Sequence, residues 1–229
     1  MIDGGGGFNR PPYLYMATNV DICNLALSQL GENGQVTALN PPDGSDYAAH
    51  CSNYYPIALR KLFEEFDWSF AQTRARLNKL ASFDTSLYAY KNAYALPSDC
   101  VRVTRVAEAK ELDTVCPFIT EWPRNYEIQY SKTTDNRILL TDVDNAVLQY
   151  TIYKDAPALF PTYFIEALVL GLAVYLVGPL KRSDAASSMA QNLRQAYQNA
   201  LSEAKTIDAQ NAARRKYPYV ASQLRARWV

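Results

Sequence analysis

The sequence predicts an α+β protein in which a bundle of long, partly kinked helices carries an inserted antiparallel β-meander and an extended C-terminal tail. Helical spacing of apolar residues, strand-like alternation and a basic aromatic end are the three patterns that predict it. We therefore expect four parts. They are a flexible N-terminal arm at 1–15, a helical bundle domain built from 16–69 and 156–213, a β-rich domain at 70–155, and a C-terminal docking tail at 214–229.

A first helix is expected near residues 20–30. Thr18 or Asn19 suits its N-cap, Asp21 complements the positive end of the helix dipole, and Gly31 suits its end. The apolar residues at helical spacing predict a buried face made of Ile22, Cys23, Leu25, Ala26 and Leu30.

A second helix is expected over about 45–66, because apolar residues recur there every three or four positions. Pro56 lies inside this helix and removes one backbone hydrogen bond, so we expect a kink. The predicted core stripe consists of Tyr47, Cys51, Tyr55, Leu59, Leu62 and Phe66.

Strands are expected between the helices, because apolar and polar residues alternate over 101–107, 126–131 and 147–153. A short middle strand is expected at 137–141, between the turn-forming segments TTDN and DVDN. Together these strands predict an antiparallel meander, with 137–141 as its short middle strand.

Two helices are expected after the β-rich region. The segment YFIEALVLGLAVYLVGPL at 163–180 is the most apolar in the chain. Glu166 interrupts one end and Gly178-Pro179 breaks the other, so we expect a buried core helix and no membrane span, which would need about twenty apolar residues. The last helix, at 184–213, would be about 45 Å long. Its stripe comprises Met189, Leu193, Ala196, Tyr197, Ala200, Leu201, Ala204 and Ile207.

Composition indicates a globular protein without a strong overall field. The chain has 229 residues, of which 48% are hydrophobic and 20% charged. Lys plus Arg and Asp plus Glu both number 23, so net charge does not attract nucleic acid or acidic membranes. The 17 tyrosines are compatible with extensive protein–protein contact. The four cysteines are widely spaced and form no CxxC pair, so we expect reduced, mostly buried thiols.

The first fifteen residues, MIDGGGGFNRPPYLY, are expected to form a flexible arm because their Gly and Pro residues favour no regular element. They lack the basic and apolar regions of a signal peptide. Met16 opens the stretch in which we expect order to start, and it is a candidate alternative initiation site.

No motif in the sequence indicates an enzyme. No nucleophile and orienting group can be assembled around His50, the one histidine, and no His or Cys has metal-ligand spacing. The acidic group at 64–67 is expected to be a solvated helix end, because adjacent helix residues point in different directions. Asp142 and Asp144 are expected in a hairpin turn, since the Gly and the bidentate Glu of a calcium loop do not follow. We expect no catalytic residue, cofactor or metal; a site made between subunits stays open.

Four aromatic residues fall within eight positions of the stretch LFEEFDWSFAQTRARL, at 62–77: Phe63, Phe66, Trp68 and Phe70. The first two are neighbours on a helix face, and the last two would share one face of an extended segment. This pattern predicts a corner of the core. The alternative is a platform for nucleic-acid bases, which would need Lys or Arg beside the rings, whereas the nearest charges are acidic.

The C-terminal tail is basic and aromatic, and no acidic residue follows Asp208. Arg, Tyr and Trp dominate interface hot spots, so the tail is a candidate for insertion into a partner protein. Plain disorder is the alternative. The predicted interface residues are Arg214, Arg215, Lys216, Tyr217, Tyr219, Leu224, Arg225, Arg227 and Trp228.

Three stretches of the N-terminal half carry a resemblance. CNLALSQLGE at 23–32 ends a helix with Gly, YYPIALRKLFEEFDWSFAQTRARL at 54–77 holds a Tyr-Pro helix ending in W-x-F-A, and YAYKNAYALPSDCVRVTRV at 88–106 joins a Tyr-rich segment and L-P-x-D to a strand. Together they resemble the head-to-tail adaptor, or connector, family (tail tubular protein A-like) of short-tailed bacteriophages, the podoviruses. The C-terminal half agrees in layout alone, and 1–15 has no counterpart.

The resemblance implies a non-enzymatic structural protein of the virion. Adaptors of this family form a ring, expected to hold twelve copies, beneath the portal protein. The ring extends the DNA channel and presents a platform for the tail nozzle, a tail tubular protein B-like protein. DNA would pass through the lumen without specific binding. The chain would be made in the bacterial host cytoplasm and reside in the tail or neck of the virion, with 214–229 docked on the portal.

The alternative function is a nucleic-acid-binding accessory protein that uses the same basic tail. Its five cations would grip phosphates, so its affinity for DNA would fall steeply as salt rises.

Overall fold

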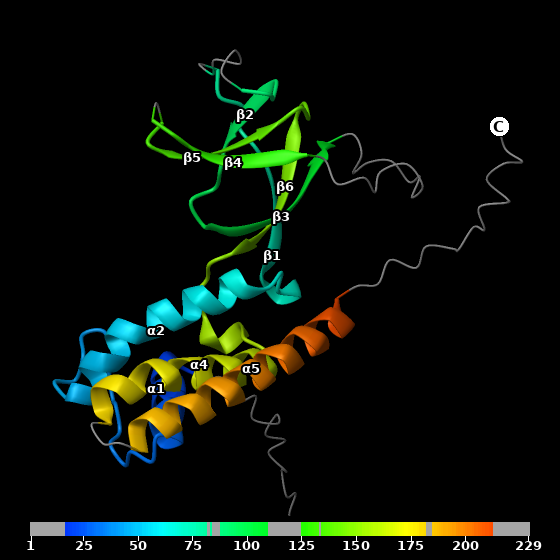
Figure 1. Cartoon of the computed structure of the whole chain (residues 1–229). Helices are drawn as coiled ribbons and strands as arrows, with labels where there is room; N and C mark the ends of the chain where they lie inside the picture. The colour runs from blue at the N-terminus through cyan, green and yellow to red at the C-terminus, as the bar shows by residue number, and fades with distance from the viewer. Residues whose placement is uncertain are drawn as a thin grey trace, which may run out of the picture. The chain divides into compact units, whose positions relative to one another are not determined.

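The structure is a computed structural model that describes residues 17–81, 83, 88–109, 125–132, 134–181 and 185–212. Its helices are α1 (Asn19–Gln29), α2 (Asp46–Glu65), α4 (Thr162–Leu180) and α5 (Ala185–Asn211), with 3-10 turns η1 (Ser69–Ala71) and η3 (Pro157–Leu159). Its strands are β1 (Gln72–Arg76), β2 (Asn92–Ala95), β3 (Cys100–Glu108), β4 (Tyr126–Ser131), β5 (Asn136–Thr141) and β6 (Ala146–Ile152) (Figure 1). The α+β class is therefore confirmed.

The chain divides into two compact units, one drawn from 1–59 and 155–201 and the other from 60–154 and 202–229. The first unit is helical, and the second holds the six strands. The boundaries expected from the sequence stay a prediction, and the expected arm and docking tail lie outside the described residues.

Local sequence signals determine the ends of α1. The Thr18 hydroxyl accepts a hydrogen bond from the Asp21 backbone N–H at 3.1 Å, and the Asp21 carboxylate accepts one from the Thr18 N–H at 2.9 Å. This reciprocal capping box satisfies two backbone donors. Gly31, with φ of 69°, follows the last turn. The buried face consists of Ile22, Cys23, Ala26, Leu27 and Leu30.

The prediction of this buried face was wrong for one residue. Leu25 is 41% exposed, and Leu27 takes its place in the core. At 100° per residue the buried arc is centred between Cys23 and Ala26, which turns Leu25 about 130° away from it.

The loop between α1 and α2 is held by side chains. The Asn24 amide donates to the Val36 carbonyl at 3.0 Å and accepts from the Val36 N–H at 2.8 Å. The Glu32 carboxylate accepts from the Tyr47 hydroxyl at 2.8 Å and pairs with Lys181 Nζ at 2.7 Å. These contacts fix the loop to both neighbouring helices.

The apolar helix α4 is longer than expected. Gly178-Pro179 does not end it, because Pro179 lies one residue from its C-terminus and the Lys181 N–H still donates to the Val177 carbonyl at 2.8 Å. By length and composition, α4 is the one helix in the described ranges that is apolar enough to cross a membrane, and 50% of its most apolar stretch is buried. The absence of a membrane span therefore stays a prediction.

The long helix α5 spans 27 residues, which corresponds to about 40 Å. Of its predicted stripe, Leu193, Leu201 and Ala204 are buried and the other members are half-buried. Tyr197 packs over Gly171 of α4, where an added Cβ would lie 3.1 Å from its ring. Glycine thus permits close approach of the two helices.

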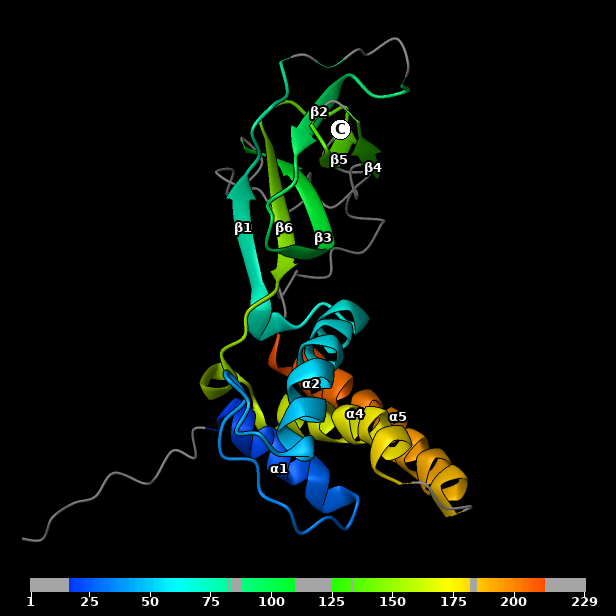
Figure 2. The ribbon, with the colours of Figure 1, turned by 90° about the vertical axis from the view of Figure 1, so that its left-hand side faces the viewer.

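The strands form two antiparallel three-stranded sheets, with orders β1-β6-β3 and β2-β5-β4. Figure 2 shows the first of these face-on. The expected hairpin of β4 and β5 is present, but β6 leaves the meander and lies between β1 and β3. The single meander was therefore wrong. The pattern of β6 explains the error, because most of its residues are buried on both faces, as in a central strand, and its partner β1 is more than seventy residues away.

Candidate functional site

The candidate site is the aromatic corner at the end of α2. We define it as Phe63, Phe66, Trp68 and Phe70. Ring centroids lie 5.3 Å apart for Phe66 and Trp68, 6.2 Å for Trp68 and Phe70, and 6.3 Å for Phe63 and Phe70. Phe63 and Trp68 are fully buried, and the other two are half-buried. The two fully buried rings, Phe63 and Trp68, offer no face to a nucleic-acid base, so the geometry favours a structural role for the corner.

The extended segment expected for Trp68 and Phe70 is only partly present. Trp68, with φ of −57° and ψ of 120°, precedes the 3-10 turn η1, and Phe70 lies within that turn. Asp208 of α5 explains the turn. Its carboxylate accepts from the Ser69 N–H at 2.8 Å and from the Ser69 hydroxyl at 2.9 Å.

The sequence did not lead us to Asp208, yet the structure buries it, with 1% of the residue exposed. A signal was available. Asp208 follows Leu201 by seven positions and Ala204 by four, so it continues the apolar stripe of α5. A carboxylate at such a position must find partners in the protein, because an unpaired buried charge is very costly.

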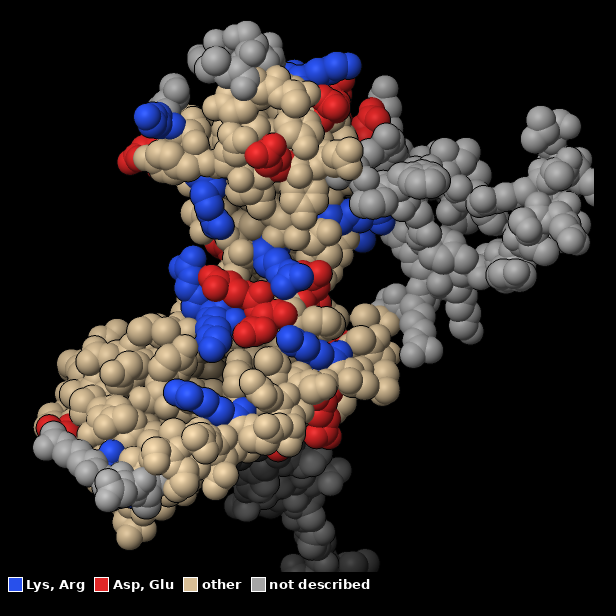
Figure 3. Space-filling model, viewed as in Figure 1, with Lys and Arg blue, Asp and Glu red and all other residues tan. Residues whose placement is uncertain are grey.

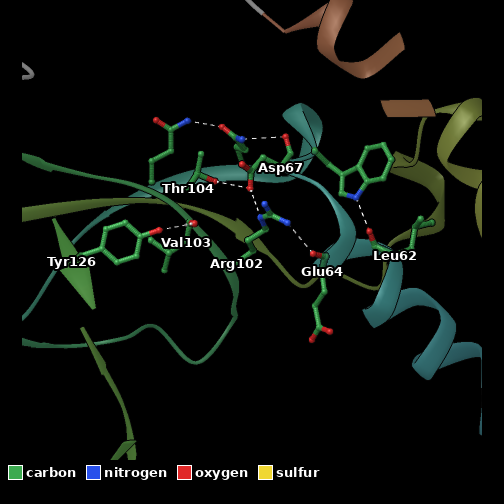
Figure 4. A network of polar contacts seen from close by, with 10 residues as sticks. Leu62, Glu64, Asp67, Arg102, Val103, Thr104 and Tyr126 are labelled. Atoms are coloured by element: carbon green, nitrogen blue, oxygen red, sulfur yellow. Dashed lines mark hydrogen bonds and ion pairs between the residues drawn. The ribbon is translucent and has the colours of Figure 1, made fainter. Parts of the chain in front are cut away.

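Two side chains complete the C-terminus of α2 (Figure 4). The last four carbonyls of a helix have no partner within it. The Trp68 indole N–H donates to the Leu62 carbonyl at 2.7 Å, and Arg102 Nη1 donates to the Glu64 carbonyl at 3.1 Å. The Arg102 charge also complements the negative end of the helix dipole. The corner therefore ends α2 by side-chain capping.

Asp67 connects the end of α2 to the first sheet, β1-β6-β3. Its carboxylate pairs with Arg102 Nε at 3.0 Å and accepts from the Thr104 hydroxyl at 3.1 Å (Figure 4). Its backbone carbonyl accepts from the Gln72 side chain at 3.2 Å. Asp67 thus bonds to residues of both β1 and β3.

The acidic group at 64–67 is paired with cations. Glu64 pairs with Arg60 at 3.1 Å, and Glu65 with Lys205 at 3.6 Å. Figure 3 shows charges of both signs gathered around the end of α2. These side chains are partly exposed, so each pair adds little stability. The carboxylates are engaged within the fold, which favours structure over acid–base chemistry.

The other sequence candidates lie apart from the corner. The His50 ring is stacked with Tyr54 at 6.5 Å. The Asp142 carboxylate accepts from the Lys91 N–H at 3.0 Å, and the Asp144 carboxylate accepts from the Asn92 amide at 3.0 Å. Both aspartates therefore hold the turn before β6. Among the described residues, no group of three or more His, Cys, Asp or Glu side chains could hold a metal ion.

The described cysteines are buried free thiols. A hydrogen bond between Cys23 and Cys51 raises the pKa of Cys23, and burial raises it further. The same hydrogen bond lowers the pKa of Cys51, although burial acts in the opposite direction. Burial raises the pKa of Cys100 to about 11. Cys23 and Cys100 are therefore protonated at neutral pH, and a protonated thiol is a poor nucleophile. Cys116 lies outside the described residues.

The tail predicted to form an interface, 214–229, also lies outside the described residues. No protein-family model matches the chain, and no curated protein matches it.

Proposed function

We propose that this protein is a structural component of a short-tailed phage virion. It forms an adaptor ring that joins the portal to the tail nozzle and extends the DNA channel, as the resemblance to the head-to-tail adaptors implies. The observation that carries the proposal is the stretch 54–77. It resembles the family's Y-P helix and W-x-F-A ending, and it contains the aromatic corner.

The other two resembling stretches also have structural roles, which supports the proposal. In 23–32, Gly31 ends α1 and Asn24 and Glu32 fix the following loop. In 88–106, the L-P-x-D turn leads from β2 into β3. There the Asp99 carboxylate accepts from the Tyr150 hydroxyl at 3.2 Å, and the Asp99 carbonyl accepts from the Tyr153 N–H at 2.9 Å.

A ring component needs rigid elements that can pack against copies of themselves. The first unit supplies long helices, with α4 and α5 packed closely at Gly171, and the second supplies two sheets. We further propose that the helices form a bundle and that 214–229 is a docking tail.

The test mixes the purified chain with the portal of the same phage, followed by electron microscopy with rotational averaging. We expect an added ring of twelve subunits beneath the portal. A well-folded chain that leaves the portal bare would contradict the proposal.

The docking segment is tested by deleting 214–229, which lies beyond the end of α5. We expect portal binding to be lost while the circular dichroism spectrum and melting temperature stay unchanged. A control that scrambles the same sixteen residues keeps length and charge, and separates specific docking from simple attraction. Unchanged binding after deletion would refute docking by the tail.

The alternative accessory function makes a different prediction from the basic tail. Duplex DNA would bind to the free chain at low salt, and the affinity would fall steeply as salt rises. An absence of DNA binding at low salt would exclude this reading.

A further inference from the structure

Helix α5 carries an exposed face made almost wholly of amide side chains. We define the amide face as Gln191, Asn192, Gln195, Gln198 and Asn199. All five are exposed. At 100° per residue they lie within an arc of about 120°, and Arg194 lies about 40° beyond its edge. The face therefore has no formal charge over more than two helical turns.

Helix α2 offers a comparison. Its exposed charged residues lie near its two ends, and its exposed middle positions are uncharged but hold a single amide, Asn53, so the run of amides distinguishes α5. The exposed charged residues of α2 are Asp46, Arg60, Lys61 and Glu64. Helix propensity does not account for the difference, because Lys, Arg and Glu are as favourable as Gln and more favourable than Asn. Solubility also favours charge at exposed positions.

The chemistry of the amide face excludes the usual partners of an exposed helix. Protein interfaces rely on Trp, Tyr and Arg anchors, and an interfacial membrane helix needs an apolar side. The amide face has neither. What it offers is a hydrated, hydrogen-bonding surface without charge of either sign.

Such a surface suits a polyanion that must move past it. Duplex DNA carries about one negative charge per 1.7 Å, so about seven phosphates would lie beside the roughly 12 Å rise of the amide face. Lysines there would hold phosphates through counterion release, and carboxylates would repel them. We propose that the amide face of α5 lines the DNA channel of the ring and lets duplex DNA slide. This inference rests on the proposed adaptor function.

The test uses phage particles assembled with the variant chain Gln191→Lys/Gln198→Lys, and measures the rate of DNA ejection in vitro. Both substitutions keep helix propensity and an extended side chain, so folding is preserved. Because every subunit contributes two new cations, we expect ejection to slow by at least about tenfold at about 50 mM salt and to recover by about 200 mM.

Two controls isolate the position and the sign of the new charge. Ala49→Lys/Asn53→Lys places two lysines at exposed positions of α2 and should leave the ejection rate unchanged. Gln191→Glu/Gln198→Glu adds charge of the opposite sign to the amide face and should produce no slowing that salt relieves.

The outcomes separate this inference from the proposed function. If the wild-type chain adds no ring to the portal, the adaptor function and the channel assignment are both refuted. If rings form but the amide-face lysine variant ejects DNA like its α2 control, the channel assignment is overturned while the adaptor function stands. If the amide-face variants lose the ring and the α2 control keeps it, the face is a contact between subunits and the channel assignment is again overturned.

Discussion

Replacing Asp208 by Ala should be among the most destabilising single changes in the described chain. The Asp208 carboxylate is buried and accepts two hydrogen bonds from Ser69, at 2.8 and 2.9 Å. The substitution removes both bonds and leaves two half-buried donors of Ser69 without this acceptor. It therefore acts on the turn η1 from a position 139 residues away.

The magnitude follows from the type of hydrogen bond. A hydrogen bond to a charged group contributes about 1.5 to 3 kcal/mol, and removing the carboxylate also relieves the cost of burying a charge. We expect Asp208→Ala to lower the free energy of unfolding by about 2 to 4 kcal/mol. Asp208→Asn keeps one acceptor oxygen and should cost about half as much. Ser69→Ala loses one bond and should cost about 1 to 2 kcal/mol.

Urea unfolding followed by far-ultraviolet circular dichroism measures these differences. The control Glu203→Ala removes an exposed carboxylate from the same helix and should stay within about 0.5 kcal/mol of wild type. A double-mutant cycle of Asp208→Ala and Ser69→Ala should show strong coupling. If Asp208→Ala costs less than about 0.5 kcal/mol, or if Asn is as costly as Ala, the hydrogen bonds do not stabilise the corner as argued.

Three further predictions address the corner, the sheet core and the helix contact. Trp68→Phe removes the indole donor from the Leu62 carbonyl and should cost about 2 to 3 kcal/mol in urea unfolding; a loss below about 1 kcal/mol would contradict this capping role. Burial, with its carboxylate neighbour, raises the pKa of Tyr150 from 10.0 to about 12, so stability should be full below pH 10 and fall as pH rises towards 12. Tyr150→Phe should flatten that fall, and equal slopes would refute the assignment. Gly171→Val should destabilise by about 1 to 3 kcal/mol by overpacking Tyr197, and Tyr197→Ala should relieve part of that loss; fully additive losses would argue against the contact.

Short-range signals explain most of what could be predicted. The capping box of Thr18 and Asp21, and Gly31 after the last turn, lie within a few residues of the helix ends that they determine. The hairpin of β4 and β5 was predictable for the same reason, because a short turn joins the two strands. The capping of α2 was not, because one donor comes from Arg102, nearly forty residues further along the chain.

The sequence by itself determined the α+β class, the order of the helices and the aromatic content of the corner. Periodicity and caps act between near neighbours, and they can be read without knowing the fold. The tertiary structure decided that β6 pairs with β1 and β3, that η1 forms at Phe70, and that Asp208 is buried against it. Each of these depends on groups far apart in the sequence, because a strand or a buried carboxylate is stabilised by whichever partner the fold brings to it.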